Sequence, residues 1–260
     1  MSLLADILAN KQREVDALRR TPRTGVSRES IDVLAALRRK DPLCVRIIAE
    51  VKLRSPSAGV LSHALSPADR AVAYAEAGAA MVSILCDGPH FEGSFEHLTS
   101  ARARLDGAGT PIPLLAKEFV VDERQIAEAR DRGADAVLLI ARIVSPARLA
   151  ELAAAARAEH IEPFVEVIDE RELEAALAAR ARVVGVNARD LDSLRIDVAC
   201  TGRVLAAIPR GVVAVHLSGL RQPSDVAEIA RGRADAALVG EALMRKDDPR
   251  ALLSSLVSAG

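Results

Sequence analysis

The chain has 260 residues, half of them hydrophobic, and its 35 basic and 36 acidic side chains nearly cancel. This balance excludes a strongly basic surface for nucleic acid or for an anionic membrane, so we expect neither partner. Three widely spaced cysteines without a CxxC pair indicate neither a zinc site nor a disulfide framework.

The first 42 residues are predicted to form a helical extension ahead of the first strand. Their start is charged and amphipathic and lacks the long apolar region of a signal peptide, and no apolar run approaches the length of a membrane span. We therefore expect a cytoplasmic protein. Two helices are predicted, at residues 3–19 and 28–39, joined by the loop TPRTGVS. Because they precede the first strand, we expect them to pack on or over one end of the domain.

Eight apolar runs alternate with alanine-rich segments along the rest of the chain. They are CVRIIAEVK from Cys44, AAMVSIL from Ala79, PIPLLAK from Pro111, ADAVLLI from Ala134, EPFVEV from Glu162, RVVGVN from Arg182, VVAVHLS from Val212 and ADAALVG from Ala234. Most are continuously apolar, as parallel strands are when both faces are covered. Eight βα units in this length predict a closed (β/α)8 TIM barrel at residues 43–260, in a single domain. The alternative, an open doubly wound sheet, usually has a GxGxxG turn, and none is present.

The segments between the strands carry signals for helix ends. Ser66-Pro67 and Ser145-Pro146 are typical starts, with serine as N-cap and proline in the first turn. Further starts are predicted at Asp122, Asp169, Ser224 or Asp225, and Asp248-Pro249, and Gly133 is a predicted C-terminal glycine. A weak internal repeat, RGADAVLLI against RGRADAALVG, fits a helix end, a tight turn and a buried strand in both copies.

Polar residues stand where these strands end, which is where barrel enzymes place their chemistry. They are Glu50 and Lys52 after the first strand, Lys117 after the third, Glu166 on the fifth, Asn187 and Arg189 after the sixth, Ser218-Gly219 after the seventh and Gly240 after the eighth. Charges in apolar runs are unfavourable unless they are paired or used. A buried structural network is one interpretation. A cluster of acids and bases with mutually tuned pKa values is the interpretation we favour.

A phosphate site is predicted at the last two strands, whose loops commonly bind phosphate in this fold. These loops are Ser218-Gly219-Leu220 and the segment VGEAL, which contains Gly240 and Glu241. Glycine lets backbone N–H groups approach an anion, and a helix start adds its dipole. In the loop after the first strand, Arg54 and Ser55 could also reach a phosphate, although an ordinary solvated loop would have the same composition.

Several segments in order resemble one enzyme family. They are AEVKLRSPSAG, VSILCDGPHFEGS, LLAKEFVVDERQIAEARDRGADAVLLI, FVEVIDERELEAAL, VVGVNARDLDSLRID and LVGEALMRKDDP, at the expected strand ends. Together they resemble the indole-3-glycerol phosphate synthase family, from the N-terminal helix to the last helix. The resemblance implies a ribulose-phosphate-binding barrel and a carboxy-lyase of tryptophan biosynthesis that uses no metal or organic cofactor.

The implied substrate is a phosphorylated small molecule, 1-(2-carboxyphenylamino)-1-deoxyribulose 5-phosphate. Ring closure, decarboxylation and dehydration convert it to indole-3-glycerol phosphate. The resemblance implies that Lys117 is the acid for ring closure, that Lys52 and Glu166 serve the loss of the hydroxyl, and that Glu50 tunes a lysine. The remaining implied contacts are Asn187 and Ser218 with the intermediate, Arg189 and Lys52 with the carboxylate, Phe91 with the anthranilate ring, and Ser55, Arg54, Gly219, Gly240 and the Glu241 backbone with the phosphate. A monomer or weak homodimer is expected.

Four positions depart from the family pattern. Leu217 stands where a glutamate usually precedes Ser-Gly, and Glu118 replaces the aspartate of a Lys-Asp-Phe segment. Ala188 stands in place of a common second asparagine, and Cys86 stands where a threonine is frequent. Leu217 leaves two alternatives open: a related phosphate-binding barrel enzyme with an altered substrate, such as one like phosphoribosylanthranilate isomerase or the tryptophan synthase α subunit, or a catalytically silent homologue. His216 could be a rewired catalytic group, but a hydrogen-bonded core histidine is the interpretation we favour.

Overall fold

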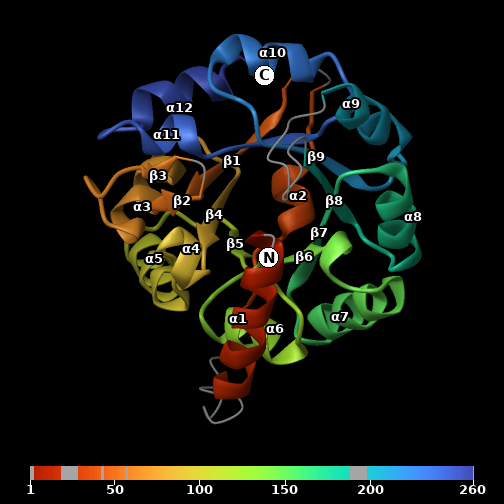
Figure 1. Cartoon of the computed structure of the whole chain (residues 1–260). Coiled ribbons are helices and arrows are strands. Elements are labelled where there is room, and N and C mark those ends of the chain that lie inside the picture. The colour runs from red at the N-terminus through yellow and green to blue at the C-terminus, as the bar shows by residue number, and fades with distance from the viewer. Residues whose placement is uncertain (1–2, 19–28, 42–43, 57, 188–197, 260) are drawn as a thin grey trace.

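The computed structural model describes residues 3–18, 29–41, 44–56, 58–187 and 198–259. Eight parallel strands form a closed barrel in the order β1-β10-β9-β8-β7-β6-β5-β4, ringed by helices (Figure 1). The strands are β1 (Arg46–Val51), β4 (Met81–Leu85), β5 (Leu114–Lys117), β6 (Ala136–Ile140), β7 (Glu162–Val167), β8 (Val183–Asn187), β9 (Val213–Leu217) and β10 (Ala236–Val239). All eight expected strands and the TIM-barrel fold are therefore confirmed.

Helices follow the strands around the ring. They are α3 (Pro67–Glu76), α5 (Phe95–Gly107), α6 (Glu123–Asp131), α7 (Pro146–Ala158), α8 (Glu170–Ala178), α9 (Val198–Ala207), α10 (Pro223–Ala230) and α12 (Arg250–Val257). Short elements lie near the strand ends: the hairpin of β2 (Arg54–Ser55) and β3 (Gly59–Val60), helices α4 (Gly88–Phe91) and α11 (Glu241–Met244), and the 3-10 turn η1 (Ala141–Ile143). No described helix is both long enough and apolar enough to cross a membrane.

The helix starts show which local signals suffice. Ser66, Asp122, Ser145 and Asp169 each accept a hydrogen bond from a backbone N–H of the first turn, as predicted, and Gly133 has a positive φ of 95°. The prediction for α10 was wrong by a few residues. Its N-cap is Gln222, and the Asp225 carboxylate reaches back to the N–H groups of Arg221 and Gln222. The last helix is capped at Pro249, as the Asp248-Pro249 signal indicated.

The internal repeat has a structural explanation. Asp135 precedes β6, and its side chain accepts a hydrogen bond of 2.9 Å from Leu114 N, while its own N–H donates to Leu114 O. Asp235 precedes β10 and makes the same two bonds with Ala214, at 2.9 and 2.7 Å. In both copies the aspartate therefore fixes the register of its strand against the preceding one.

Two apolar layers make up the core. The outward-facing strand residues pack against the helices, and the inward-facing residues, such as Ile48, Met81 and Phe164, fill the barrel. Since side chains alternate along a strand, residues that share parity with Ile48 on β1 point inward, and Glu50 is one of them. This alternation decides which polar residues reach the barrel interior.

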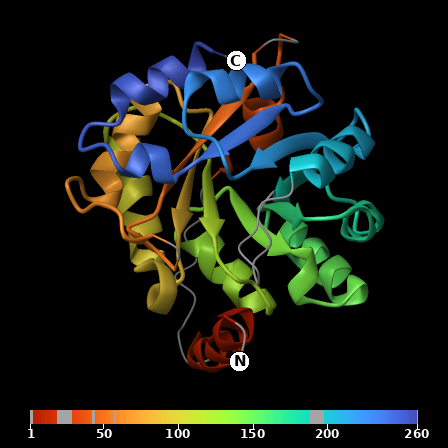
Figure 2. The same cartoon turned by 45° about the horizontal axis from the view of Figure 1, so that its top comes forward.

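The N-terminal extension covers both ends of the barrel. The sequence had led us to expect that it would cover one end. Helix α1 (Leu3–Leu18) packs on α6 and lies beyond the ends of the strands (Figure 2). Helix α2 (Val33–Leu37) puts Val33 and Leu37 into the inner core at the opposite end. There, Arg38 donates to the carbonyls of Arg210 and Gly211, just before β9. The single expected position was wrong because the two helices present separate apolar faces and each fits a different end.

Candidate active site

The carboxyl ends of the strands open into a cavity of about 690 Å³. A volume of this size is typical of a small-molecule site. Most of the site residues predicted from the sequence line it: Glu50, Lys52, Ser55, Phe91, Lys117, Glu166, Asn187, Ser218, Gly219, Gly240 and Glu241. The barrel therefore brings together residues that are far apart in the chain.

Glu50 and Lys52 at the end of β1 form one ion pair of the site. Lys52 Nζ lies 2.9 Å from Glu50 Oε1, and Glu50 is almost fully buried. Burial by itself raises the pKa of Glu50, but the positive charges of Lys52 and Lys117 outweigh it and hold the pKa below its ordinary value. Glu50 is therefore ionised at neutral pH and can orient both lysines.

Lys117 at the end of β5 lies close to Glu166 of β7, the next strand but one in the barrel. The distance from Lys117 Nζ to Glu166 Oε2 is 3.6 Å, and the Lys117 side chain is 20% exposed. Burial lowers the pKa of Lys117, but Glu166 and Glu50 raise it by more, so the net shift is upward. Lys117 consequently carries a proton at neutral pH, which an acid in a reaction requires.

A hydrogen-bonded chain fixes one oxygen of Glu166. Ser218 Oγ donates to Asn187 Oδ1 at 3.0 Å, and Asn187 Nδ2 donates to Glu166 Oε1 at 2.9 Å. The other oxygen, Oε2, is buried in the ion pair with Lys117, but at 3.6 Å it accepts no hydrogen bond from the described residues. An oriented carboxylate whose second oxygen accepts no hydrogen bond is suited to accept a proton from a ligand.

The loops after β9 and β10, which contain Gly219 and Gly240, lie beside the charged cluster. Positive φ values at Ser218 (69°) and Gly219 (90°) turn the chain sharply at the end of β9. Gly240, the N-cap of α11, lies directly against Glu50: a Cβ added there would stand 2.7 Å from Glu50 Oε1. Glycine is thus required at this position because the carboxylate of Glu50 occupies the space of a side chain.

An aromatic wall lies across the barrel from the β9 loop. β5 and β9 are four strands apart in the ring of eight, so their ends face one another. Phe119, just after β5, and Phe91 of α4 line the cavity with ring centroids 6.2 Å apart and planes inclined by 35°. The cavity therefore has an aromatic side, a charged middle and a side formed by glycine loops.

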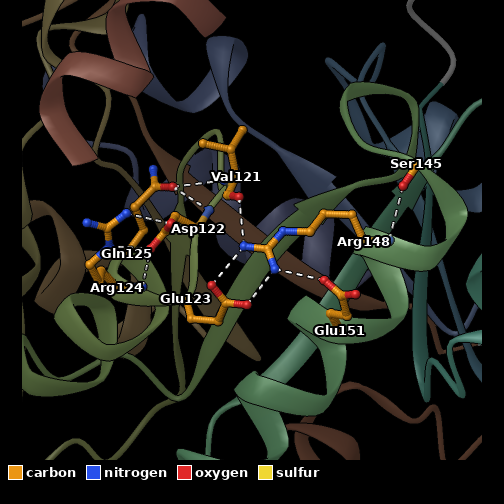
Figure 3. Close-up of polar contacts among 8 residues, drawn as sticks. All are labelled: Val121, Asp122, Glu123, Arg124, Gln125, Ser145, Arg148 and Glu151. Carbon is orange, nitrogen blue, oxygen red and sulfur yellow. Dashed lines mark hydrogen bonds and ion pairs between the residues drawn. The ribbon is translucent and has the colours of Figure 1, made fainter. Parts of the chain in front are cut away.

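Side chains of α6 and α7 form a polar network with the segment after Lys117 (Figure 3). Gln125 Nε2 donates to Phe119 O, and Gln125 Oε1 accepts from the N–H groups of Val121 and Asp122. Arg148 of α7 donates to both oxygens of Glu123, at 2.5 and 2.7 Å, and to Val121 O at 3.2 Å. These contacts tie the loop after Lys117, which carries Phe119, to α6 and α7.

One predicted site residue, Arg54, does not line the cavity. Arg54 lies on the β2–β3 hairpin with 49% of its side chain exposed, and it pairs with Glu92 at 3.5 Å. The hairpin alternation that buries Ser55 turns Arg54 outward, so the expectation that it lines the site was wrong. Arg189 lies outside the described residues.

Residues that the sequence reasoning did not select also line the cavity, among them Leu4, Ile7, Arg221, Arg245 and Lys246. The basic three follow the two glycine loops within a few residues, a proximity that could have identified them. Leu4 and Ile7 lie one turn apart on α1, but their spacing alone does not indicate which end of the barrel the helix covers.

Leu217 and its neighbour His216 have distinct environments. Leu217 is buried and faces the barrel interior, where its Cδ1 would stand 2.6 Å from a Cβ placed on Gly185. His216 follows the opposite alternation and points away from the interior, so it is not a rewired catalytic group. Burial lowers the pKa of His216 to about 4, which leaves it neutral. The prediction of a hydrogen-bonded histidine was wrong for Nδ1 of His216, because this atom is buried and has no hydrogen-bond partner among the described residues.

Comparison with known proteins gives a consistent family. A family model described as indole-3-glycerol phosphate synthase matches residues 4–256. Indole-3-glycerol phosphate synthase from Mycobacterium ulcerans is 42% identical over 230 residues, which is 88% of this chain and 82% of that protein. Indole-3-glycerol phosphate synthase 1 from Streptomyces coelicolor is 42% identical over 253 residues, covering 97% of this chain and 91% of that protein.

Similar solved structures support the fold. A crystal structure of 3-hexulose-6-phosphate synthase aligns with a TM-score of 0.65 at 17% identity, covering 83% of this chain and 99% of that one. Thiamine phosphate pyrophosphorylase from Pyrococcus furiosus aligns with a TM-score of 0.62 at 13% identity, covering 82% and 94%. At these identities the likeness concerns the barrel alone.

Proposed function

Because this chain belongs to the indole-3-glycerol phosphate synthase family, we propose that it converts 1-(2-carboxyphenylamino)-1-deoxyribulose 5-phosphate to indole-3-glycerol phosphate, carbon dioxide and water. The observation that supports this most directly is the pairing of a protonated Lys117 with Glu166, whose Oε2 has no hydrogen-bond partner among the described residues. One acid and one base thereby face the same cavity from two strands, β5 and β7, that only β6 separates.

The first step needs an acid. As the ring carbon that bears the carboxylate attacks the C2′ carbonyl, negative charge develops on the carbonyl oxygen, and Lys117 donates a proton to it. Ring aromaticity is then restored when the carboxylate leaves as carbon dioxide and its bonding electron pair returns to the ring. Glu50 and Glu166 keep Lys117 protonated before the reaction, because both carboxylates raise its pKa.

The second step removes water from the ring-closed intermediate. The C2′ hydroxyl leaves with a proton from an acid, for which Lys52 is the candidate, and Glu166 accepts the proton from C1′ as the C1′–C2′ double bond forms. Asn187 holds Glu166 in place through its hydrogen bond of 2.9 Å. General acids and bases of this kind each contribute about 10²- to 10⁴-fold in rate.

Substrate orientation follows from the three parts of the cavity. The phosphate is placed at Ser55, Gly219, Gly240 and the Glu241 backbone, where Arg221 and Lys246 add positive charge nearby. The anthranilate ring packs on Phe91 at the opposite side, and Lys52 engages its carboxylate. Arg189 is proposed for the same carboxylate from its position in the sequence alone.

We further propose that the enzyme acts in the cytoplasm as a single barrel domain, as a monomer or weak homodimer and without nucleic acid as a partner. The described residues contain no group of three or more His, Cys, Asp or Glu side chains arranged to hold a metal ion.

The test is the fluorescence of indole-3-glycerol phosphate after the carboxyphenylamino-deoxyribulose phosphate is added. Wild-type protein should form product, and Lys117→Ala should lose at least about 10²-fold in kcat. Lys40→Ala is the matched control, since Lys40 is exposed at the other end of the barrel. A folded wild type that binds phosphate but forms no product would reject the activity and indicate that Leu217 marks a changed substrate.

A further inference from the structure

Helix α1 carries a lysine that is completely buried. Lys11 has no exposed side-chain surface, and its Nζ lies 2.8 Å from Asp87 Oδ1, 2.9 Å from Glu118 Oε1 and 2.8 Å from Glu14 Oε2. Lysine is almost never fully buried unless it is paired. Burial lowers the pKa of Lys11, but the carboxylates outweigh it, so the ammonium keeps its charge. None of these charged groups takes part in the reaction steps proposed above.

Each of the two buried carboxylates also holds an aromatic residue of the cavity. Asp87 caps α4, its Oδ2 accepting from His90 N at 3.1 Å, and the next residue of that helix is Phe91. Glu118 Oε1 accepts from Phe119 N at 2.6 Å, and its chain neighbour on the other side is Lys117. A single ammonium thus joins α1 to both segments that form the aromatic wall.

The same helix contributes to the cavity itself. Leu4 and Ile7 line it, and Ile7 lies four residues before Lys11, on the same face of α1. When Lys11 sits between Asp87 and Glu118, these apolar side chains are held at the cavity. Without the ammonium, two buried carboxylates would face each other, and their repulsion would oppose docking of the helix.

We propose that Lys11 is a positioning residue, which anchors α1 over the cavity and fixes Phe91 and Phe119 through Asp87 and Glu118 so that the aromatic part of the substrate is bound in register with Lys117. The kinetic part of this inference depends on the activity proposed above, whereas the anchoring of α1 does not. Glu118, in place of the family's usual aspartate, extends the carboxylate by one methylene toward Lys11.

The test compares Lys11→Met with Lys11→Arg, and uses Arg13→Met as the matched control, because Arg13 is exposed on the same helix. Hydrogen–deuterium exchange reports the docking of α1 and α4, and steady-state kinetics gives kcat and KM separately. We expect faster exchange in α1 and α4 for K11M with the barrel strands unchanged, and a KM at least fivefold higher. K11R should recover part of both, and R13M should match the wild type.

A second variant separates positioning from charge balance. The triple variant K11M/D87N/E118Q removes the repulsion between the carboxylates, so it should regain thermal stability yet keep the raised KM. Wild-type exchange and a KM within twofold of wild type in K11M would overturn the inference, as would a triple variant whose KM returns to the wild-type value. If the wild type forms no product, the proposed activity is rejected. Faster α1 exchange in K11M would in that case still support the anchoring of α1 by Lys11.

Discussion

Replacing Gly240 with alanine should disable the site without adding or removing any charge. The new Cβ would stand 2.7 Å from Glu50 Oε1, 3.3 Å from Glu50 Cβ and 3.4 Å from Glu50 Cδ. Non-bonded heavy atoms are at their optimum at about 3.5 Å or more. Glu50 must therefore withdraw by more than about half an ångström, and because it is buried and held by Lys52, the ion pair of 2.9 Å moves with it.

The expected size of the effect follows from that displacement. Misplacing a reacting group by about 1 Å can cost about 10²-fold in rate, so kcat of Gly240→Ala should fall by about ten- to a hundredfold. Overpacking a filled core typically costs about 1–3 kcal/mol in the free energy of unfolding. For a chain of this size each kcal/mol lowers Tm by about 2–4 °C.

The assay is steady-state product formation together with thermal unfolding. Gly202→Ala in α9 is the control, because no atom lies within 4 Å of its added Cβ, and alanine in a helix interior should stabilise by about 0.5–1 kcal/mol. Combining G240A with Glu50→Asp, which shortens the side chain, should cost less stability than the sum of the two single variants. Wild-type kcat and Tm in G240A would refute the reasoning.

Three further predictions concern the site and its surroundings. Glu166→Gln keeps the bond from Asn187 but removes the base, so kcat should fall by about 10²- to 10⁴-fold with KM little changed; a loss below tenfold in the fluorescence assay would contradict this. Gly185→Ala would bring a Cβ within 2.6 Å of Leu217 Cδ1, so the free energy of unfolding, measured in urea, should drop by about 1–3 kcal/mol, and Leu217→Ala in that background should add less than its separate cost. Because the pKa of His216 is lowered to about 4, the unfolded chain binds a proton that the folded one does not between about pH 6.5 and 4. Stability should therefore fall by up to about 3 kcal/mol as pH drops through that window, and His216→Leu should remove this slope.

Much of the architecture is determined by the sequence itself. Eight apolar runs, most of them continuous, predict parallel strands covered on both faces. The local cap signals at Ser66, Asp122, Ser145 and Asp169 place helix starts correctly, because each depends on a few neighbouring residues. The position of polar residues at the ends of the predicted strands was enough to predict most residues of the site. The start of α10 was misplaced because Asp225 caps from inside the first turn, which looks the same in sequence as a conventional N-cap.

Other features of the site could be known only from the tertiary structure, because they depend on groups that are far apart in the chain. Closure of the barrel sets the 3.6 Å between Lys117 and Glu166, and with it the direction of the Lys117 pKa shift, since charge interactions depend on distance and burial rather than on sequence spacing. The same holds for the N-terminal extension. Lys11 reads as one charge on an amphipathic helix, and only packing against Asp87 and Glu118 makes it a buried anchor at the end of the barrel where the reaction is proposed to occur.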